Sequence, residues 1–226
     1  MKKLFFIIFL MAFSFAITAN AKKPKEKNVW PKAVLTLNDG TVLNGYLRND
    51  IHFMKKKIYF SETENGKDVK YPIVNIKSLE VDNALQDGKK RTFILIDDDP
   101  KFPFLATEIF KGKHVTGYME PFAFDNTTTS RSFGGIMSTN TTYLGCRAYH
   151  YTVDGGKYVY YWMLFESEKV NAKREKYSQK KLLKKIKDKF KDYPVVAEEV
   201  EKRGLTAERI HENPTILLEI LDKNLQ

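Results

Sequence analysis

The chain has 226 residues, which is enough for one large domain or two small ones with their own hydrophobic cores. Its single cysteine, Cys146, excludes an internal disulfide, so the stability of the fold must come from packing. The formal net charge is +10, and much of the positive charge lies in one segment near the C-terminus.

The N-terminus has the three-part pattern of a bacterial export signal. Two lysines precede the apolar run Leu4–Ile17, and Ala19-Asn20-Ala21 supplies the small residues that a signal peptidase requires. The run is shorter than the roughly 20 residues that span a bilayer as a helix, and no cysteine for lipid attachment stands near the cleavage point. We therefore predict a signal peptide at 1–21, and a periplasmic or extracellular mature chain without a transmembrane helix.

The residues after the signal predict a short leader and a small β module. Residues 22–32 are rich in lysine and contain two prolines, which is typical of a flexible leader. Residues 33–85 alternate between apolar and polar side chains and are interrupted by polar turns, which predicts a small antiparallel barrel or curled sheet. Asp39-Gly40 between two alternating runs predicts a hairpin, because Gly supplies the positive φ of the turn.

The hairpin segment Leu37–Leu47 resembles the opening of SH3-like and Sm-like small barrels. In those barrels a glycine a few residues after the turn allows a sharp strand bend, and Gly45 occupies that place here. The resemblance implies barrel geometry. It does not imply RNA binding, because the nucleotide-contacting segment of Sm proteins has no counterpart in this chain.

Residues 86–170 predict a second antiparallel β region. Thr92–Ile96 forms one strand, and two hairpins follow, each pairing the segments on either side of a glycine-containing turn. The first hairpin joins Phe104–Phe110 to His114–Met119, and the second joins Tyr143–Val153 to Lys157–Phe165.

The last strand of this region is apolar on both of its predicted faces. Strict alternation assigns Tyr158, Tyr160, Trp162 and Leu164 to one face, and Val159, Tyr161, Met163 and Phe165 to the other. Such a strand must be covered on both sides, as in a sandwich or in a sheet with helices on its back.

A long segment at 121–142, rich in Ser, Thr, Asn and Gly, predicts a loop within the second β region. Its apolar residues make it a candidate loop for binding an envelope protein or a glycan: Phe122, Phe124, Phe133 and Met137. A mobile insert without a ligand has the same composition, so both interpretations stay open.

Residues 171–226 predict three to four short helices that pack on the sheet. Leu182, Leu183, Ile186 and Phe190 form the apolar stripe of the first helix. Asp192, Thr206 and Asn213 are the predicted caps of the helices that follow, with Pro194 and Pro214 in their first turns. The fold class is therefore α+β, with an antiparallel β-rich body followed by helices.

The first of these helices also predicts a basic surface, formed by Lys180, Lys181, Lys184, Lys185, Lys187, Lys189 and Lys191. A basic amphipathic helix can lie on an anionic membrane, so peripheral membrane contact is one interpretation. The other is that the apolar stripe packs on the sheet and the lysines are solvated. Export makes nucleic acid a poor partner, whereas anionic lipid and acidic polysaccharide fit the charge.

The order of elements, together with Asp192-Tyr193-Pro194 and Glu212-Asn213-Pro214, is similar to that of uncharacterised exported proteins of Bacteroidota. These proteins combine a signal peptide, a β-rich body and short helices with a Tyr-Pro break and a late Asn-Pro. The resemblance implies no established activity.

The sequence predicts no catalytic, cofactor-binding or metal site. Cys146, His150 and Asp154 suggest a thiol protease, but residues four apart on one strand are roughly 13 Å apart, beyond hydrogen-bond reach. The four histidines lack metal-ligand spacing, and the acidic triplet at 97–99 lacks the pattern of a calcium loop.

The leading hypothesis is a non-enzymatic envelope or secreted protein that is structural or binds a protein or glycan. The alternative is a periplasmic hydrolase whose acid and base meet only in the fold, drawn from Asp97, Glu108, Glu120 and the histidines.

Overall fold

The computed structural model describes residues 30–49, 51, 56–84, 88–131, 137–165 and 178–225, and for 122–144 it describes the backbone alone. The predicted signal peptide, most of the predicted leader, His52 and Phe133 lie outside these residues. None of the helices in the described ranges has the length and apolar composition needed to span a bilayer.

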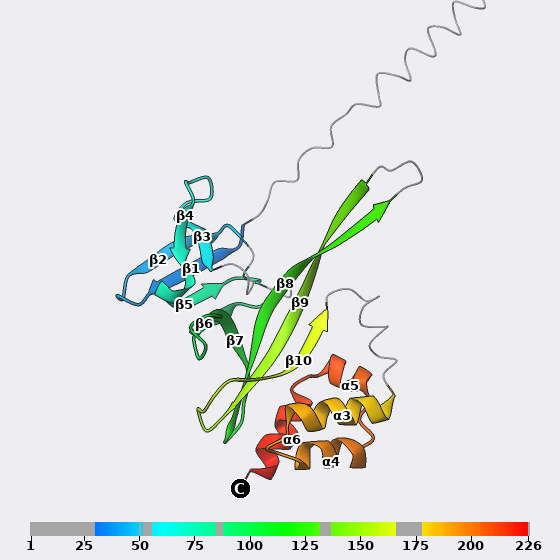
Figure 1. The fold of residues 1–226 in the computed structure, drawn as a ribbon. Helices are drawn as coiled ribbons and strands as arrows, with labels where there is room; N and C mark the ends of the chain where they lie inside the picture. Colours follow the sequence, from blue (N-terminus) through cyan, green and yellow to red (C-terminus); the bar gives the residue numbers. More distant parts are fainter. Residues whose placement is uncertain are drawn as a thin grey trace, which may run out of the picture.

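The described strands form one open antiparallel sheet in the order β10-β9-β8-β7-β6-β5-β1-β2-β3-β4 (Figure 1). Their bounds are β1 (Lys32–Leu37), β2 (Val42–Leu47), β3 (Lys57–Ser61), β4 (Val69–Pro72), β5 (Ile76–Val81), β6 (Arg91–Ile96), β7 (Phe104–Lys111), β8 (Val115–Arg131), β9 (Met137–Val153) and β10 (Val159–Phe165). A 3-10 turn, η2 (Ile73–Asn75), precedes β5. The predicted α+β class is confirmed, and pairing of β5 with β6 joins the two predicted β regions in one sheet.

The first five strands curl around a core in which Leu35, Phe60 and Leu79 are almost fully buried, and Phe93 of β6 completes this core. The predicted hairpin at Asp39-Gly40 is confirmed: β1 pairs with β2, and Gly40 has a φ of +88°. A Cβ on Gly45 would lie 2.2 Å from the backbone oxygen of Ser61. Only glycine therefore allows β3 to approach β2 this closely, and the curled sheet depends on it.

The β8–β9 hairpin is much longer than the sequence predicts. Each strand has 17 residues, and their register runs without a break from Val115↔Val153 to Arg131↔Met137. The prediction of a loop at 121–142 is therefore wrong, because 121–131 and 137–142 are strands. Residues 132–136 lie outside the described residues. The threonines of this segment explain the difference, because β-branched residues fit a pleated strand even where no apolar alternation marks it.

Four helices cover one face of β8, β9 and β10 (Figure 1). They are α3 (Gln179–Lys189), α4 (Val195–Lys202), α5 (Ala207–Glu212) and α6 (Ile216–Asn224). Leu182 and Ile186 of the predicted stripe are buried against this face, as expected. A Cβ on Gly117 would lie 2.3 Å from Cδ1 of Leu218, so the missing side chain lets α6 approach β8.

Of the predicted helix caps, the one at Thr206 is confirmed, because its Oγ1 accepts a hydrogen bond from the Arg209 backbone N–H. The caps at Asp192 and Asn213 are wrong: Pro194 precedes α4 and Thr215 precedes α6, and neither supplies a side-chain cap. A turn precedes each of these helices, so the N-cap position lies two residues after the predicted one, at Pro194 instead of Asp192 and at Thr215 instead of Asn213.

A carboxylate on α6 holds the turn between β7 and β8. Asp222 accepts backbone hydrogen bonds from Lys113, His114 and Val115 at 3.0, 2.7 and 2.8 Å. Burial acts to raise the pKa of Asp222, but these three hydrogen bonds outweigh it and hold the pKa below its usual range. The last helix is thus joined to a turn more than 100 residues earlier in the chain.

The predicted alternation of β10 is interrupted by a β-bulge between Tyr160 and Trp162. Tyr161 and Trp162 both lie in the helix-facing core and are fully buried, whereas Tyr160 contacts His150 on the reverse face. The prediction that Tyr160 and Trp162 share a face is therefore wrong. The bulge adds one residue, and this lets two large aromatic side chains face the helices.

Candidate functional site

One pairing of an acid and a base in the second β region is buried on the reverse face of the sheet. Glu120 on β8 and His150 on β9 are diagonal neighbours, and Glu120 Oε2 lies 3.0 Å from His150 Nε2. Their side chains are only 6% and 11% exposed. The ring of Phe104 stacks on His150 at 4.9 Å, and Tyr160 meets the same imidazole edge-on at 5.7 Å.

Burial raises the pKa of Glu120, and the hydrogen bond to His150 offsets part of that rise. The second carboxylate oxygen, Oε1, has no hydrogen-bond partner among the described residues. A buried carboxyl group with a raised pKa is a frequent feature of catalytic sites, but buried polar pairs inside a sheet perturb pKa values in the same way.

Of the acids and bases predicted for a hydrolase, the described residues bring only Glu120 and His150 together. Glu108 and Asp97 are solvent-exposed. The acidic triplet has a structural role in addition to being solvated: Asp98 accepts a hydrogen bond from the Tyr158 backbone N–H at 2.8 Å, which ties the β6–β7 loop to the start of β10.

The residues of the thiol-protease pattern are engaged elsewhere, as the strand spacing predicts. Asp154 hydrogen-bonds to His114 at 2.9 Å, and His150 to Glu120. Cys146 is buried and lies in register with Phe165 of β10. No group of three His, Cys, Asp or Glu side chains in the described ranges is arranged to hold a metal ion.

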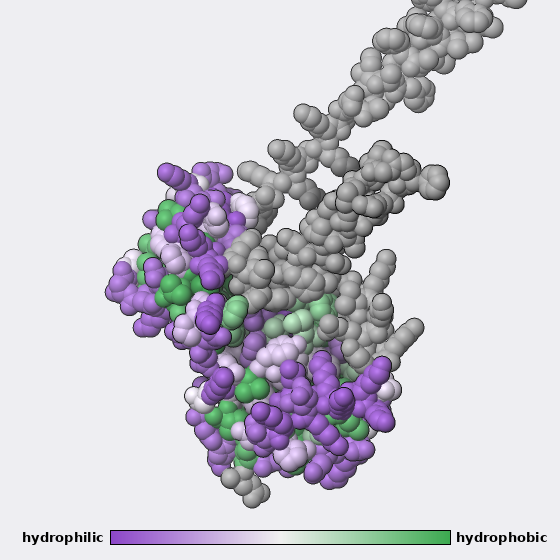
Figure 2. Space-filling view, viewed as in Figure 1, coloured by the Kyte–Doolittle hydropathy of each residue, from purple (hydrophilic) through white to green (hydrophobic). Residues whose placement is uncertain are grey.

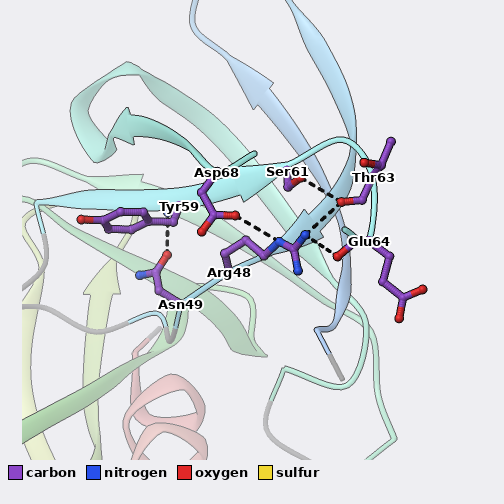
Figure 3. A network of polar contacts seen from close by, with 7 residues as sticks. All are labelled: Arg48, Asn49, Tyr59, Ser61, Thr63, Glu64 and Asp68. Carbon is purple, nitrogen blue, oxygen red and sulfur yellow. Dashed lines mark hydrogen bonds and ion pairs between the residues drawn. The ribbon is translucent and has the colours of Figure 1, made fainter. Parts of the chain in front are cut away.

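A second polar cluster, which the sequence does not reveal, surrounds Arg48 within strands β1–β5, residues 32–81, which we term the curled lobe (Figure 3). The Arg48 guanidinium donates to the backbone oxygens of Thr63 and Glu64, and its Nε lies 3.3 Å from Asp68 Oδ1. A cavity of about 130 Å³ lies beside this cluster, between Phe60 and Tyr71. Because Arg48 is directed at the backbone of the β3–β4 turn, the cluster holds that turn in place.

The outer part of the β8–β9 hairpin presents unpaired backbone. The pairing of β7 with β8 ends at Thr107↔Met119, and that of β10 with β9 ends at Phe165↔Cys146. Beyond these points, residues 122–131 and 137–145, which we term the arm, pair with no described strand other than β8 and β9. Figure 1 shows the arm extending past β7 and β10. The positions of Phe122, Phe124 and Met137 fall in the arm.

The predicted basic surface divides into two groups. Lys185 and Lys189 lie against β10, which is an edge strand, with their Nζ atoms 3.8 Å and 4.9 Å from the ring centres of Trp162 and Tyr160. The other five lysines are exposed, and Figure 2 shows a mainly hydrophilic surface over the helices. Those five, which we term the α3 lysine face, are Lys180, Lys181, Lys184, Lys187 and Lys191.

Comparisons of the chain with models of protein families, with curated proteins and with solved structures each found no match. The features of the described residues that bear on function are the arm, the α3 lysine face and the buried pair of Glu120 and His150.

Proposed function

We propose that this chain is an exported envelope or secreted protein that binds a partner protein through the arm and performs no catalysis. The observation that carries the proposal is the arm itself, a two-stranded ribbon of nine registered pairs from Ala123↔Gly145 to Arg131↔Met137 that no other described strand flanks. Its length is roughly 30 Å at about 3.3 Å per residue.

The chemistry of the arm favours a protein over a glycan. Along each free edge of a strand, backbone N–H and C=O groups point outward, and an extended segment of another protein satisfies them by adding a strand. An isolated two-stranded ribbon is only marginally stable in water, so a third strand would stabilise it as well as bind it. Thr, Asn and Ser dominate both strands of the arm, which keeps the unbound ribbon compatible with water.

The buried pair of Glu120 and His150 gives the competing hydrolase hypothesis little support. A general base must reach its substrate or a water molecule directly. Here Phe104 and Tyr160 contact the imidazole, and both side chains of the pair are almost fully buried. A structural hydrogen bond within the sheet accounts for this geometry.

Shortening the arm tests the proposal. Asp125 and Tyr143 are registered partners, so replacing 126–142 by Asn-Gly closes the hairpin with a two-residue turn and preserves the pairs below it. A photo-crosslinking amino acid replaces Phe122, and crosslinking is carried out in cell envelopes. We expect the protein with the full arm to capture one defined partner protein, and the protein with the shortened arm to capture none. An unchanged melting temperature checks that the body still folds.

Two matched variants separate strand addition from other effects of the arm. Thr127→Lys with Thr129→Lys retains the length of the arm but places charges that oppose the docking of another strand, and Thr127→Ser with Thr129→Ser is its control. Capture of the same partner by the shortened or lysine-bearing arm would contradict the proposal. Export is tested separately, by sequencing the N-terminus of the protein from the periplasmic fraction, which is expected to begin at Lys22.

A further inference from the structure

The α3 lysine face carries positive charge that the described residues leave unneutralised. None of its five ammonium groups has a described carboxylate within 4.0 Å, although Lys202, Arg203 and Arg209 on the neighbouring helices each have one. Asp188, the one acidic residue of α3, lies 4.0 Å from Lys189, which is outside this face.

These lysines share one side of the helix. Lys180, Lys184 and Lys187 are spaced by four and three residues, which places them along one stripe. Lys181 lies beside the stripe, and Lys191 follows in the turn after the helix. The opposite side of α3 is committed to the core, because Leu182, Ile186 and Phe190 are buried. The exposed side of the helix therefore offers a partner mainly positive charge.

This arrangement fits an extended anionic surface better than a small anion. A phosphate or carboxylate ligand is held by donors that converge on it. The lysines instead run along the helix, with roughly 10 Å between Lys180 and Lys187 at about 1.5 Å per residue. They include no arginine, which is the residue suited to bidentate recognition of a single anionic group.

We propose that the α3 lysine face adsorbs the protein onto bilayers that contain anionic lipid. The binding is electrostatic and peripheral, because the apolar stripe needed for insertion is buried in the protein core. Nucleic acid has the same charge, and its exclusion rests on the proposed export. The surface is separate from the arm, so each proposal can fail without the other.

Vesicle co-sedimentation of the purified full chain tests this inference. The vesicles contain equal parts of phosphatidylcholine and phosphatidylglycerol, and vesicles of phosphatidylcholine alone give the baseline due to the apolar N-terminal segment. The test variant combines Lys180→Gln, Lys184→Gln and Lys187→Gln. We expect it to bind the anionic vesicles, above the baseline, about a hundred-fold more weakly than the wild type, because each lysine contributes about five-fold. Added salt is expected to weaken the wild-type binding steeply.

The matched control removes the same charge elsewhere. Lys57, Lys67 and Lys77 are exposed residues of the curled lobe, and changing all three to Gln is expected to reduce binding much less. Equal losses in the two triple variants would overturn the proposal, because total charge and not this face would then determine adsorption. Tighter binding to alginate or to duplex DNA than to the anionic vesicles, at equal anion concentration, would also overturn it.

Discussion

Oε2 of Glu120 lies 3.0 Å from Nε2 of His150, close to the point where the β8–β9 hairpin leaves the sheet. The pair joins the two strands that continue into the arm, and its burial makes each partner dependent on the other. Removing one member leaves the other buried without a hydrogen bond.

His150→Ala is accordingly expected to lower the free energy of unfolding by about 3 kcal/mol near neutral pH, because it leaves the Glu120 carboxylate buried and unpaired. Glu120→Gln is expected to cost less, because the amide keeps a hydrogen-bonding group at the same place. Chemical denaturation measures both. Glu108→Gln, at an exposed position of β7, is the control and should be nearly neutral. A loss of less than about 0.5 kcal/mol in His150→Ala would contradict a structural role for the pair.

The same pair predicts a pH dependence of stability. Because the pKa of Glu120 is raised in the folded state, the folded protein binds this proton more tightly than the unfolded chain does. The resulting stabilisation is fully present below the ordinary glutamate pKa of 4.5 and is lost as the pH rises through the raised value. Relative to Glu120→Gln, the wild type should therefore gain stability as the pH falls from neutral towards 4.5. Denaturation midpoints of both proteins across this range measure the difference, and a constant difference would refute the expectation.

The contribution of Asp222 to stability is expected to depend on pH in the opposite direction. Its pKa is lowered in the folded state, so its contribution is present above the ordinary aspartate value of 3.8 and is lost as the pH falls through the lowered one. Near neutral pH, Asp222→Ala leaves three backbone N–H groups without this acceptor and is expected to cost about 2 kcal/mol. Asp222→Asn keeps one acceptor oxygen and should cost about half as much. Asp188→Ala, on the exposed face of α3, is the control. Equal stabilities of Asp222→Ala and Asp188→Ala would contradict a stabilising role for the hydrogen bonds that Asp222 accepts.

Gly117 and Leu218 test the packing of the helical layer on the sheet. Gly117→Ala is expected to destabilise the fold by about 1–3 kcal/mol, because the new methyl group overlaps Cδ1 of Leu218. In a Leu218→Ala background, which removes that methyl carbon, the same substitution should cost at least 1 kcal/mol less. Thermal unfolding of the wild type, the two single variants and the double variant measures the coupling between the two residues in a double-mutant cycle. Additive effects would show that the two residues do not meet.

The sequence predicts those parts of the fold that short-range chemistry determines. The turns at Asp39-Gly40 and Asp154-Gly155 are readable because they need positive φ, and the pairing of the adjacent strands follows from the turn. Gly45 is readable for a related reason, since a glycine inside a strand marks close approach of another backbone.

Features that depend on strand register are not readable in this way. The bulge in β10 leaves no mark in a strand that is apolar throughout, so Tyr161 and Trp162 were assigned to opposite faces. Glu120 and His150 are 30 residues apart and meet only because Glu120 pairs with Ala148. The β-branched threonines at 127–129 were the available signal for the arm, but the lack of apolar alternation favoured a loop.

The hydrogen bonds that Asp222 accepts also constrain the order of folding. The turn between β7 and β8 acquires its acceptor only when α6 is in place, and His114 and Asp222 are 108 residues apart in the chain. If the chain crosses a membrane as an extended polypeptide, this end of the sheet stays incomplete until the C-terminal helix has emerged on the far side. Under the proposed export, completion of this end of the fold would therefore follow delivery across the membrane.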